Sequence, residues 1–340
     1  MLAAVTGGTG FLGSILVTRL AQRGDRVRVL TRPTSDVSAL ARLPNVELVR
    51  GDLADAAALG GLCAGADVLF HMAAVVSWER SSRDAQERVN VEGTRAVMEA
   101  ARLAGTRRVI YTSSVAAIGL PAKRGVPADE TNPFTGAEFG YFRSKHLAER
   151  VAFEAVEKHG LDVVALNPGT VFGGGASKRK TGSQKIIGMV AGGIPFYPRG
   201  GYCACDVDDV IDAHLAAVEK GRRGERYILG GHNLPLREVF GEIARQLGVR
   251  APWIPVPGPL LRVAGELNEL RSRITGRPTT ITREYAVLGN MMLAYSSDKA
   301  IRELGYRVTP WPETVAKGIR SWREREARES AAAAAREARA

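Results

Sequence analysis

The stretch Thr6-Gly7-Gly8-Thr9-Gly10-Phe11-Leu12-Gly13 decides the fold of this sequence. It follows the apolar run Leu2–Thr6, which is typical of a buried strand, and it opens a helical pattern over residues 11–23. Glycines allow a tight turn and a close backbone approach there, and the free N–H groups of the helix can bind a pyrophosphate. The stretch therefore predicts a strand–turn–helix unit that binds a dinucleotide through Gly7, Gly10, Phe11, Leu12 and Gly13.

The first half of the chain repeats this alternation of short apolar runs and helical patterns. Further strands are predicted at 26–30, 46–49, 67–71, 108–112 and 162–167, and helices at 54–63, 85–104 and 141–159. Such alternation is typical of a parallel sheet with crossover helices. We therefore expect an α/β fold, a Rossmann-type doubly wound parallel sheet with a smaller, interleaved C-terminal substrate-binding region.

The pattern loosens after Pro168, where glycine-rich loops appear. Helices are predicted at 206–219, 236–247, 260–274 and 282–293, a strand at 226–229, and loops at 173–175 and 192–201. We expect a dinucleotide-binding domain at 1–168, to which 203–230 returns, and a substrate-binding cap at 169–202 and 231–320. Residues 321–340 are expected to form a low-complexity helical tail that frays.

The chain carries 47 lysines and arginines against 36 aspartates and glutamates, a formal net charge of +11. The arginines are scattered and no stripe of basic and aromatic residues occurs, so we expect no nucleic-acid partner. The densest basic cluster is Lys178-Arg179-Lys180. It is interpreted either as a solvated loop or as a loop that steers an anionic cofactor or substrate.

Hydropathy and cysteine content argue against a membrane-spanning protein, a secreted protein and a metal-binding protein. No apolar run is long enough to span a bilayer and the first strand begins too early for a signal peptide, so we expect a cytoplasmic protein without an integral membrane segment. Cys203 and Cys205 stand one residue apart, a spacing that fits neither a zinc knuckle nor a redox pair. We expect both to pack as small apolar side chains at the end of a strand, and we expect no metal site.

The end of the second strand indicates which dinucleotide binds. An acidic residue there would bind the ribose 2′-hydroxyl of NAD, whereas this chain has Arg32, followed by Thr34 and Ser35. A cation favours NADP(H) over NAD(H), although a surface arginine beside a proline turn is the alternative. Asp52 follows the third strand and is expected either to accept from the adenine amino group or to cap the next helix.

Tyr141 and Lys145 stand four residues apart at the start of a predicted helix, on one face. A phenol has a pKa of about 10 and is a poor proton shuttle alone. A neighbouring ammonium stabilises the phenolate and lowers this pKa. Ser114, at the end of the fifth strand, can bond a substrate oxygen and hold it against the phenol. The three side chains predict general acid–base chemistry.

Together these residues resemble the extended branch of the short-chain dehydrogenase/reductase superfamily. The glycine stretch matches its cofactor motif, Tyr111-Thr112-Ser113-Ser114 its serine strand, and Tyr141 to Lys145 its active-site helix. His71-Met72-Ala73-Ala74 looks like the motif beside the nicotinamide ribose, and Asn90-Val91-Glu92-Gly93-Thr94 like the helix whose Asn completes an Asn-Ser-Tyr-Lys tetrad. The segment from Asn167 to Gly173 resembles the one that holds the carboxamide.

The resemblance implies hydride transfer at a carbonyl or alcohol carbon. It makes Tyr141 the acid/base, Lys145 both its pKa partner and a ribose ligand, and Asn90 a helper in proton relay. Spacing to Gly119 favours Ser114 over Ser113 as the catalytic serine. The same resemblance implies a homodimer formed through the helices near 85–104 and 141–159, and further cofactor contacts from Leu53, Ala73, Pro168 and Val171.

Three functions compete at this point. The closest resemblance is to the dihydroflavonol-reductase-like group, which implies an NADPH-dependent reductase or dehydrogenase of a small hydrophobic (aromatic, polyketide-like or sterol-like) molecule. A nucleotide-sugar epimerase or dehydratase with bound NAD is the second possibility. Ser113-Ser114-Val115 disfavours dehydration, and small apolar residues at 203–205 stand near where sugar enzymes carry an arginine clamp, although Arg199 is close. A noncatalytic dinucleotide-binding regulator is the third, but Tyr141 and Lys145 are intact.

Several apolar side chains are candidates for the substrate pocket, each with core or lid packing as the alternative. The candidates are Val75, Trp78, Phe134, Phe172, Phe196, Tyr197 and the predicted helix around 288–293.

Overall fold

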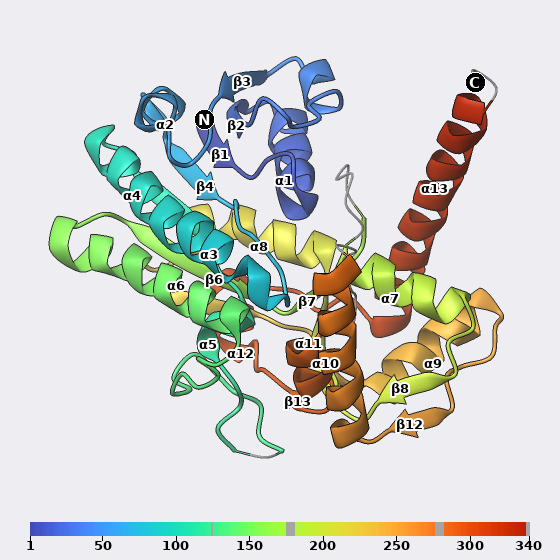
Figure 1. Ribbon diagram of the computed structural model, residues 1–340. Coiled ribbons are helices and arrows are strands. Elements are labelled where there is room, and N and C mark those ends of the chain that lie inside the picture. The colour runs from blue at the N-terminus through green and yellow to red at the C-terminus, as the bar shows by residue number, and fades with distance from the viewer. Residues whose placement is uncertain (124, 175–180, 276–281, 338–340) are drawn as a thin grey trace.

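The computed structural model describes residues 1–123, 125–174, 181–275 and 282–337. Its centre is a seven-stranded sheet in the order β3-β2-β1-β4-β5-β6-β10, and every neighbouring pair is parallel (Figure 1). The strands are β1 (Leu2–Thr6), β2 (Arg26–Thr31), β3 (Val46–Arg50), β4 (Val68–His71), β5 (Arg108–Thr112), β6 (Val163–Pro168) and β10 (Arg226–Leu229). The predicted doubly wound Rossmann-type fold is confirmed.

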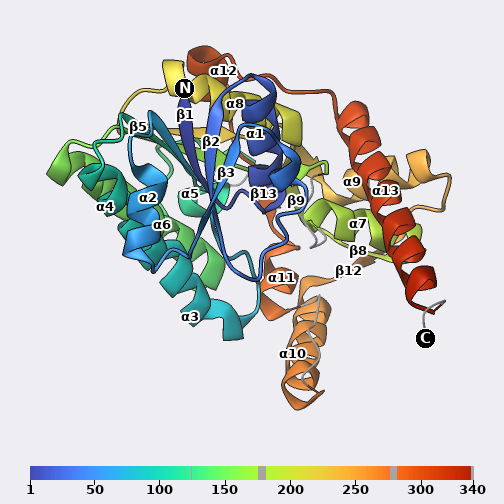
Figure 2. The same ribbon diagram turned by 90° about the horizontal axis from the view of Figure 1, so that it is seen from above.

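Helices cover both faces of this sheet (Figure 2). On one face lie α1 (Phe11–Gln22), α8 (Val207–Lys220) and α12 (Asp298–Leu304). On the other lie α2 (Ala56–Cys63), α4 (Gly93–Leu103) and α6 (Gly140–His159). Short helical turns complete this half of the chain at Leu40–Arg42, Arg80–Ser82, α3 (Arg83–Gln86) and α5 (Val115–Ile118).

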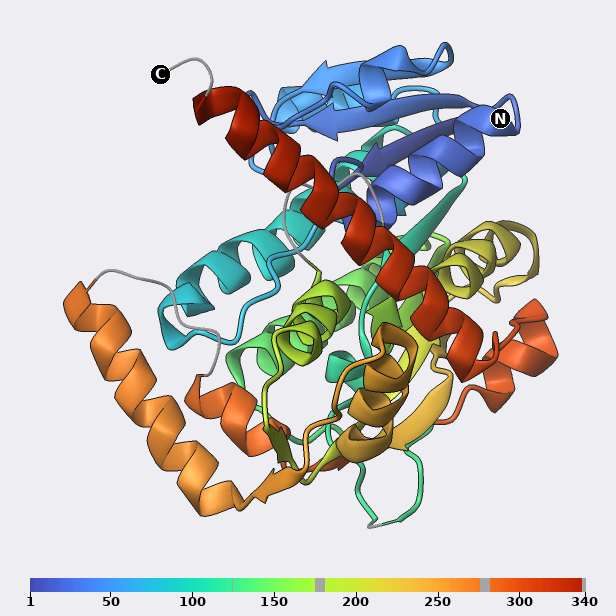
Figure 3. The same ribbon diagram turned by 90° about the vertical axis from the view of Figure 1, so that its right-hand side faces the viewer.

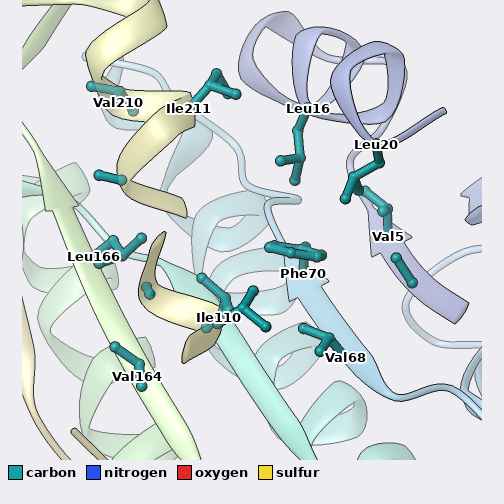
Figure 4. Packing of buried hydrophobic residues seen from close by; sticks show 14 of the residues in the cluster. Val5, Leu16, Leu20, Val68, Phe70, Ile110, Val164, Leu166, Val210 and Ile211 are labelled. Carbon is teal, nitrogen blue, oxygen red and sulfur yellow. The ribbon is translucent and has the colours of Figure 1, made fainter. Parts of the chain in front are cut away.

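Alternation along each strand sends side chains into two separate cores. Val5, Phe70 and Ile110 point toward α1 and α8, where they pack with Leu16, Leu20 and Ile211 (Figure 4). Their strand neighbours Ala4, Leu69 and Val109 pack under α2, α4 and α6 instead. Because both faces are buried, the strands have the nearly continuous apolar sequences that predicted a parallel sheet.

The segment predicted as one helix over 85–104 is interrupted. A π-helical stretch, Glu87–Glu92, lies between α3 and α4, and it contains Asn90. The Thr94 hydroxyl donates to the Asn90 backbone carbonyl oxygen at 2.6 Å, so a side chain takes part in the bonding of this turn. The residues on both sides of this stretch, Gln86 and Gly93, keep right-handed helical dihedrals and no proline lies in the segment, so the sequence carried no signal of the interruption.

A second structural layer follows β6. It holds a four-stranded sheet of β7 (Thr170–Phe172), β9 (Gly201–Asp206), β11 (His232–Pro235) and β13 (Met292–Leu293), and a two-stranded one of β8 (Phe196–Pro198) and β12 (Ile254–Val256). Its helices are α7 (Gly182–Ala191), α9 (Leu236–Leu247), α10 (Gly258–Thr275), α11 (Arg283–Leu288) and α13 (Trp311–Glu337). Among the described residues, no helix is long and apolar enough to cross a membrane.

Two expectations for this layer were wrong. The predicted helix over 282–293 ends at Leu288, because Gly289 and Asn290 turn the chain and β13 then pairs with β9. The stretch 192–201, predicted as loop, contains β8. Cys203 and Cys205 are buried in β9, as predicted for small apolar side chains in a strand.

The C-terminal helix α13 is continuous across residue 321, where the tail was predicted to begin (Figure 3). The Gln184 side chain of α7 donates to the Ser321 hydroxyl at 3.1 Å, and Trp322 packs against the core of the second layer. These contacts tie the first part of the predicted tail to the body. The division into domains stays a prediction.

The glycine turn connects β1 to α1 under tight steric limits. Gly7 has a φ of +74°, which favours glycine, and a Cβ there would lie 2.6 Å from the Ala73 backbone nitrogen. A Cβ at Gly13 would collide with the Gly7 carbonyl oxygen. The turn therefore packs directly against the chain that leaves β4.

We expect Gly13→Ala to push this turn away from α1 and to lower the free energy of unfolding by about 1–3 kcal/mol, the usual cost of overpacking. Urea denaturation measures the change, and titration with NADPH should show weaker dinucleotide binding. Gly61→Ala is the control, because its Cβ would meet no atom within 4 Å and alanine favours a helix. A Gly13→Ala protein as stable as Gly61→Ala would contradict this account of the turn.

Candidate active site

A chain of buried hydrogen bonds leads from the glycine turn to α4. Thr6 Oγ1 lies 2.7 Å from His71 Nδ1, and His71 Nε2 lies 3.0 Å from Thr94 Oγ1. The Thr94 hydroxyl hydrogen goes to the Asn90 carbonyl, so Thr94 accepts from His71 Nε2 and His71 Nδ1 accepts from Thr6. Burial and the charge of Lys145 lower the pKa of His71 to about 3, so the ring is neutral.

Lys145 is a fully buried ammonium with named partners. Its Nζ donates to the Tyr111 hydroxyl at 3.1 Å and to the Thr112 carbonyl oxygen at 2.9 Å. Burial lowers the pKa of Lys145 to about 8, although the Glu149 carboxylate acts in the opposite direction. At neutral pH the group therefore keeps its proton.

Tyr141 is buried at the start of α6, with its ring edge-on to Trp78 at a centroid distance of 5.2 Å. Burial raises the pKa of Tyr141, and the neighbouring Ser114 side chain acts in the opposite direction. Lys145 is not among the groups that shift this pKa, and its ammonium donates to Tyr111 and Thr112 instead. Tyr141 is therefore a neutral phenol at neutral pH.

The two serines at the end of β5 have different surroundings. Ser114 is the N-cap of α5, and its hydroxyl accepts from the Ala116 backbone N–H at 3.2 Å. The Ser113 hydroxyl is buried with no hydrogen-bond partner among the described residues. Of the two serines, Ser114 acts on the pKa of Tyr141, and the choice of Ser114 as the catalytic serine stays a prediction.

Glu149 is a buried carboxylate that the sequence analysis missed. It accepts from Arg226 of β10 at 3.1 Å and from the Asn167 side chain of β6 at 2.7 Å. The same Asn167 nitrogen donates to the Ser114 carbonyl oxygen at 3.0 Å. Glu149 lies one turn after Lys145 on α6, and this i, i+4 spacing was the signal that could have revealed it.

The Asn90 side chain hydrogen-bonds both to the backbone after β4 and to a side chain of α6. Its amide accepts from the Val75 N–H at 2.7 Å and donates to the Val75 carbonyl oxygen at 3.0 Å, which fixes the chain after β4. It also donates to the Ser144 hydroxyl at 3.0 Å, and Ser144 donates to the Tyr141 carbonyl oxygen at 2.9 Å. Asn90 thus connects the β4 loop to the first turn of α6.

The glycine turn fits the pyrophosphate of a dinucleotide. Gly10, the N-cap of α1, offers no side chain to cap the helix, so the first-turn N–H groups of Phe11, Leu12 and Gly13 have no side-chain cap. Gly7 packs closely on the Ala73 backbone and contributes no side chain to this turn. A helix N-terminus of this form suits a diphosphate.

The remaining predicted cofactor residues lie at strand ends. Arg32 is exposed directly after β2, and Pro168 ends β6. Leu53 and Val171 pack on the edges of the two central cores. Asp52 accepts from the Ala54 N–H at 2.8 Å, whereas the N-cap of α2 is Asp55, so the capping alternative for Asp52 was wrong.

An apolar cluster surrounds Tyr141. It contains Trp78, Phe134 and Leu288 of the candidate pocket residues, together with Ala116, Leu120, Phe139, Phe142, Val287, Met291 and Leu293. Phe172 and Tyr197 belong to a different core under α7 and α9, and Phe196 is exposed. These three therefore lie outside the cluster around Tyr141, and for Phe172 and Tyr197 the alternative of core packing applies. The basic cluster Lys178-Arg179-Lys180 lies outside the described residues.

The depressed pKa of Lys145 predicts how stability depends on pH. The folded protein releases this proton near pH 8, whereas the unfolded lysine does so near 10.5. Between these values the unfolded chain binds more protons, so the contribution of Lys145 to the free energy of unfolding rises with pH. We therefore expect the free energy of unfolding of wild type, relative to that of Lys145→Met, to rise by about 1.4 kcal/mol per pH unit in this window.

Urea denaturation of both proteins across the window measures this gain. Lys158→Met is the control, because Lys158 is an exposed lysine on the same helix, and its difference from wild type should stay constant. A constant difference for Lys145→Met as well would contradict the depressed pKa.

Comparison with known proteins places this site in a family. A family model described as the NAD dependent epimerase/dehydratase family matches residues 3–230. A putative dihydroflavonol 4-reductase of Synechocystis sp. is 36% identical over 307 residues, which cover 88% of this chain and 88% of that protein. The 4-hydroxy-2-methyl-3-oxo-4-farnesyl-3,4-dihydroquinoline-1-oxide ketoreductase of Stigmatella aurantiaca is 32% identical over 322 residues, which cover 91% and 93%.

A solved structure of another protein has a similar fold. The nucleoside-diphosphate-sugar epimerase from Pseudomonas aeruginosa has a TM-score of 0.76 and 25% identity, with 95% of this chain and 98% of that one covered. The family match spans the glycine turn, Ser114 and the helix that carries Tyr141 and Lys145. The chain belongs to the NAD-dependent epimerase/dehydratase family and is an NAD(P)-dependent oxidoreductase of the extended short-chain dehydrogenase/reductase type.

Proposed function

We propose that this enzyme is an NADPH-dependent reductase of a small hydrophobic carbonyl compound, with Tyr141 as the proton donor. The observation that carries the proposal is a neutral phenol, buried in an apolar cluster and next to Ser114. A phenol whose pKa is raised holds its proton at neutral pH, which suits the direction in which a carbonyl oxygen must receive one.

A bound nicotinamide would supply the hydride, or accept it in the oxidative direction. Tyr141 Oη gives its proton to the substrate oxygen as the carbonyl carbon becomes an alcohol carbon. Ser114 donates a hydrogen bond to the same oxygen and orients it toward the phenol. Lys145 would hold the ribose of the bound dinucleotide, the second role that the family resemblance implies for it.

The apolar surroundings of Tyr141 support an aromatic, polyketide-like or sterol-like substrate. Trp78, Phe142 and Leu288 offer rings and aliphatic carbon but few polar groups. Two relatives are named for the reduction of such molecules, a dihydroflavonol and a farnesylated quinoline. The similarity of these relatives covers about nine-tenths of the chain.

A nucleotide-sugar epimerase with bound NAD is the second candidate, since the epimerase from Pseudomonas aeruginosa shares the fold over nearly the whole chain. Buried Cys203, Ala204 and Cys205 offer no cation for a diphosphate, although the exposed Arg199 stands just upstream. Oxidation of NADPH with hydrophobic ketones and with UDP-sugars separates the two. Turnover of UDP-sugars alone, with NAD bound tightly, would exclude the reductase.

We expect Tyr141→Phe to lower kcat by a factor of about 10²–10⁴, because the proton donor is lost, and to leave NADPH affinity within about twofold of wild type. Steady-state rates and fluorescence titration measure the two quantities. Tyr227→Phe is the control, because its hydroxyl bonds Glu303 on the far side of the sheet, and it should turn over like wild type. Full activity in Tyr141→Phe would remove Tyr141 from the reaction.

Arg32 supports the choice of NADPH, because it is exposed at the end of β2 where it can meet a ribose 2′-phosphate. We expect Arg32→Asp to raise the KM for NADPH by about tenfold or more, in line with the loss of a charge-assisted contact, and to improve use of NADH. Arg42→Asp is the matched control, because Arg42 is an exposed arginine in the helical turn Leu40–Arg42. An unchanged ratio of kcat/KM for the two cofactors would contradict this role of Arg32.

We further propose a homodimer in the cytoplasm, formed through α4 and α6. A groove of about 320 Å³ runs between these helices and is lined by Met98, Val151 and Ala155 with charged residues around them. Leu103 is exposed at the end of α4. Two copies of this face would bury both features.

A further inference from the structure

Helix α10 carries its apolar residues on the side that faces away from the protein. Five of them recur at spacings of three and four residues and are 53% to 76% exposed: Leu260, Val263, Leu267, Leu270 and Ile274. We call this set the α10 stripe. A surface helix of a globular protein normally turns such a stripe toward the core, so the patterning of α10 is reversed.

The opposite side of α10 is the one that contacts the protein. Gly265 is buried there, and a Cβ at this position would lie 2.8 Å from the Thr282 carbonyl oxygen at the start of α11. Leu261, Asn268 and Ser272 lie on the same side at 100° per residue and are half-buried. The helix is thus anchored to α11 by Leu261 and by the small or polar residues Gly265, Asn268 and Ser272, and it lies at the periphery of the molecule (Figures 2 and 3).

The acidic residues of α10 are paired, and an exposed arginine lies at the edge of the stripe. Glu266 pairs with Arg262 at 3.6 Å and with Arg283 at 3.1 Å, and Glu269 accepts from the Arg283 backbone N–H at 3.0 Å. Both acids are therefore engaged within the protein. Arg271 is exposed beside the stripe, and the chain as a whole has a net charge of +11.

Exposed aromatic residues adjoin the start of α10. β12 ends two residues before the helix and pairs with β8 through Ile254 and Phe196, both of which are exposed. Trp253 is 49% exposed, and the Arg250 guanidinium lies 3.9 Å from its ring centroid. Tryptophan beside arginine is typical of side chains that sit at the boundary between lipid headgroups and acyl chains.

We propose that the α10 stripe and the edge formed by Phe196, Trp253 and Ile254 dock on a membrane surface that contains anionic lipid. An apolar face flanked by arginine and aromatic side chains is the composition of a helix that lies in the plane of the interface. Anionic headgroups attract the arginines, and the stripe enters the boundary below them. A second copy is the other possible occupant, but the stripe covers two heptads, fewer than the three or four that a coiled coil needs.

The docked helix would lie one layer from the candidate active site. α10 packs on α11, and Leu288 of α11 belongs to the apolar cluster around Tyr141. A hydrophobic molecule dissolved in the membrane would then have a short path to that cluster. Docking itself does not rest on the proposed reductase function, because it needs no bound cofactor and no turnover.

Flotation with vesicles tests the proposal on the full-length protein. We expect wild type to float with vesicles of phosphatidylcholine and phosphatidylglycerol, and less so with phosphatidylcholine alone. Leu267→Glu should weaken the partition by about tenfold or more, since an apolar side chain at the centre of the stripe becomes charged. Ile301→Ser on α12 is the matched control, an exposed apolar residue away from α10, and should float like wild type.

Three results would overturn docking. They are failure of wild type to float, flotation of Leu267→Glu equal to that of Ile301→Ser, and a dimer in light scattering that Leu267→Glu dissociates while vesicle binding stays unchanged. The last result would assign the stripe to a second copy. Reduction of a water-soluble ketone by Leu267→Glu should match wild type, and this readout fails separately if the proposed reductase function is wrong.

Discussion

The buried ammonium of Lys145 is the constraint around which the middle of this molecule is organised. A charge removed from water is tolerated only with hydrogen bonds and an opposite charge nearby. Tyr111 and Thr112 supply the hydrogen bonds, and Glu149 supplies the opposite charge one helical turn away. Glu149 is in turn held by Arg226 and Asn167. The ends of β5, β6 and β10 therefore meet α6 through polar contacts that a purely apolar interface could not specify.

The same arrangement separates two properties of the Tyr141–Lys145 pair. The charge of Lys145 is close enough to lower the pKa of His71, yet its protons are directed at Tyr111 and Thr112. Tyr141 is left in an apolar cluster, where burial raises its pKa. One helix thus carries a neutral phenol and a charged amine four residues apart. Burial favours the neutral phenol, whereas at the amine the charge of Glu149 opposes the effect of burial.

Local sequence patterns predicted those elements of the fold that depend on interactions between residues close together in the sequence. The strand Leu2–Thr6, the glycine turn and α1 follow from the apolar run, from the helical pattern after it and from steric limits at Gly7 and Gly13, and all three are found. β11 and β13 were missed because they are only four and two residues long, and their pairing with β9, far along the chain, stabilises them. Within the candidate site, Ser114, Tyr141 and Lys145 stand in recognisable motifs. Glu149 and Asn167 become meaningful only once β6 and β10 lie beside α6.

The position of β10 at the edge of the sheet determines when the polar contacts of Glu149 can form during folding. Arg226 reaches Glu149 across 77 positions of sequence, so the carboxylate gains its partner only when β10 joins β6. A nascent chain that has emerged only as far as β6 holds an unpaired acid and an open sheet edge. Completion of the polar centre is therefore a late and non-local event in folding, and a growing polypeptide must keep that edge protected until residue 229 has left the ribosome.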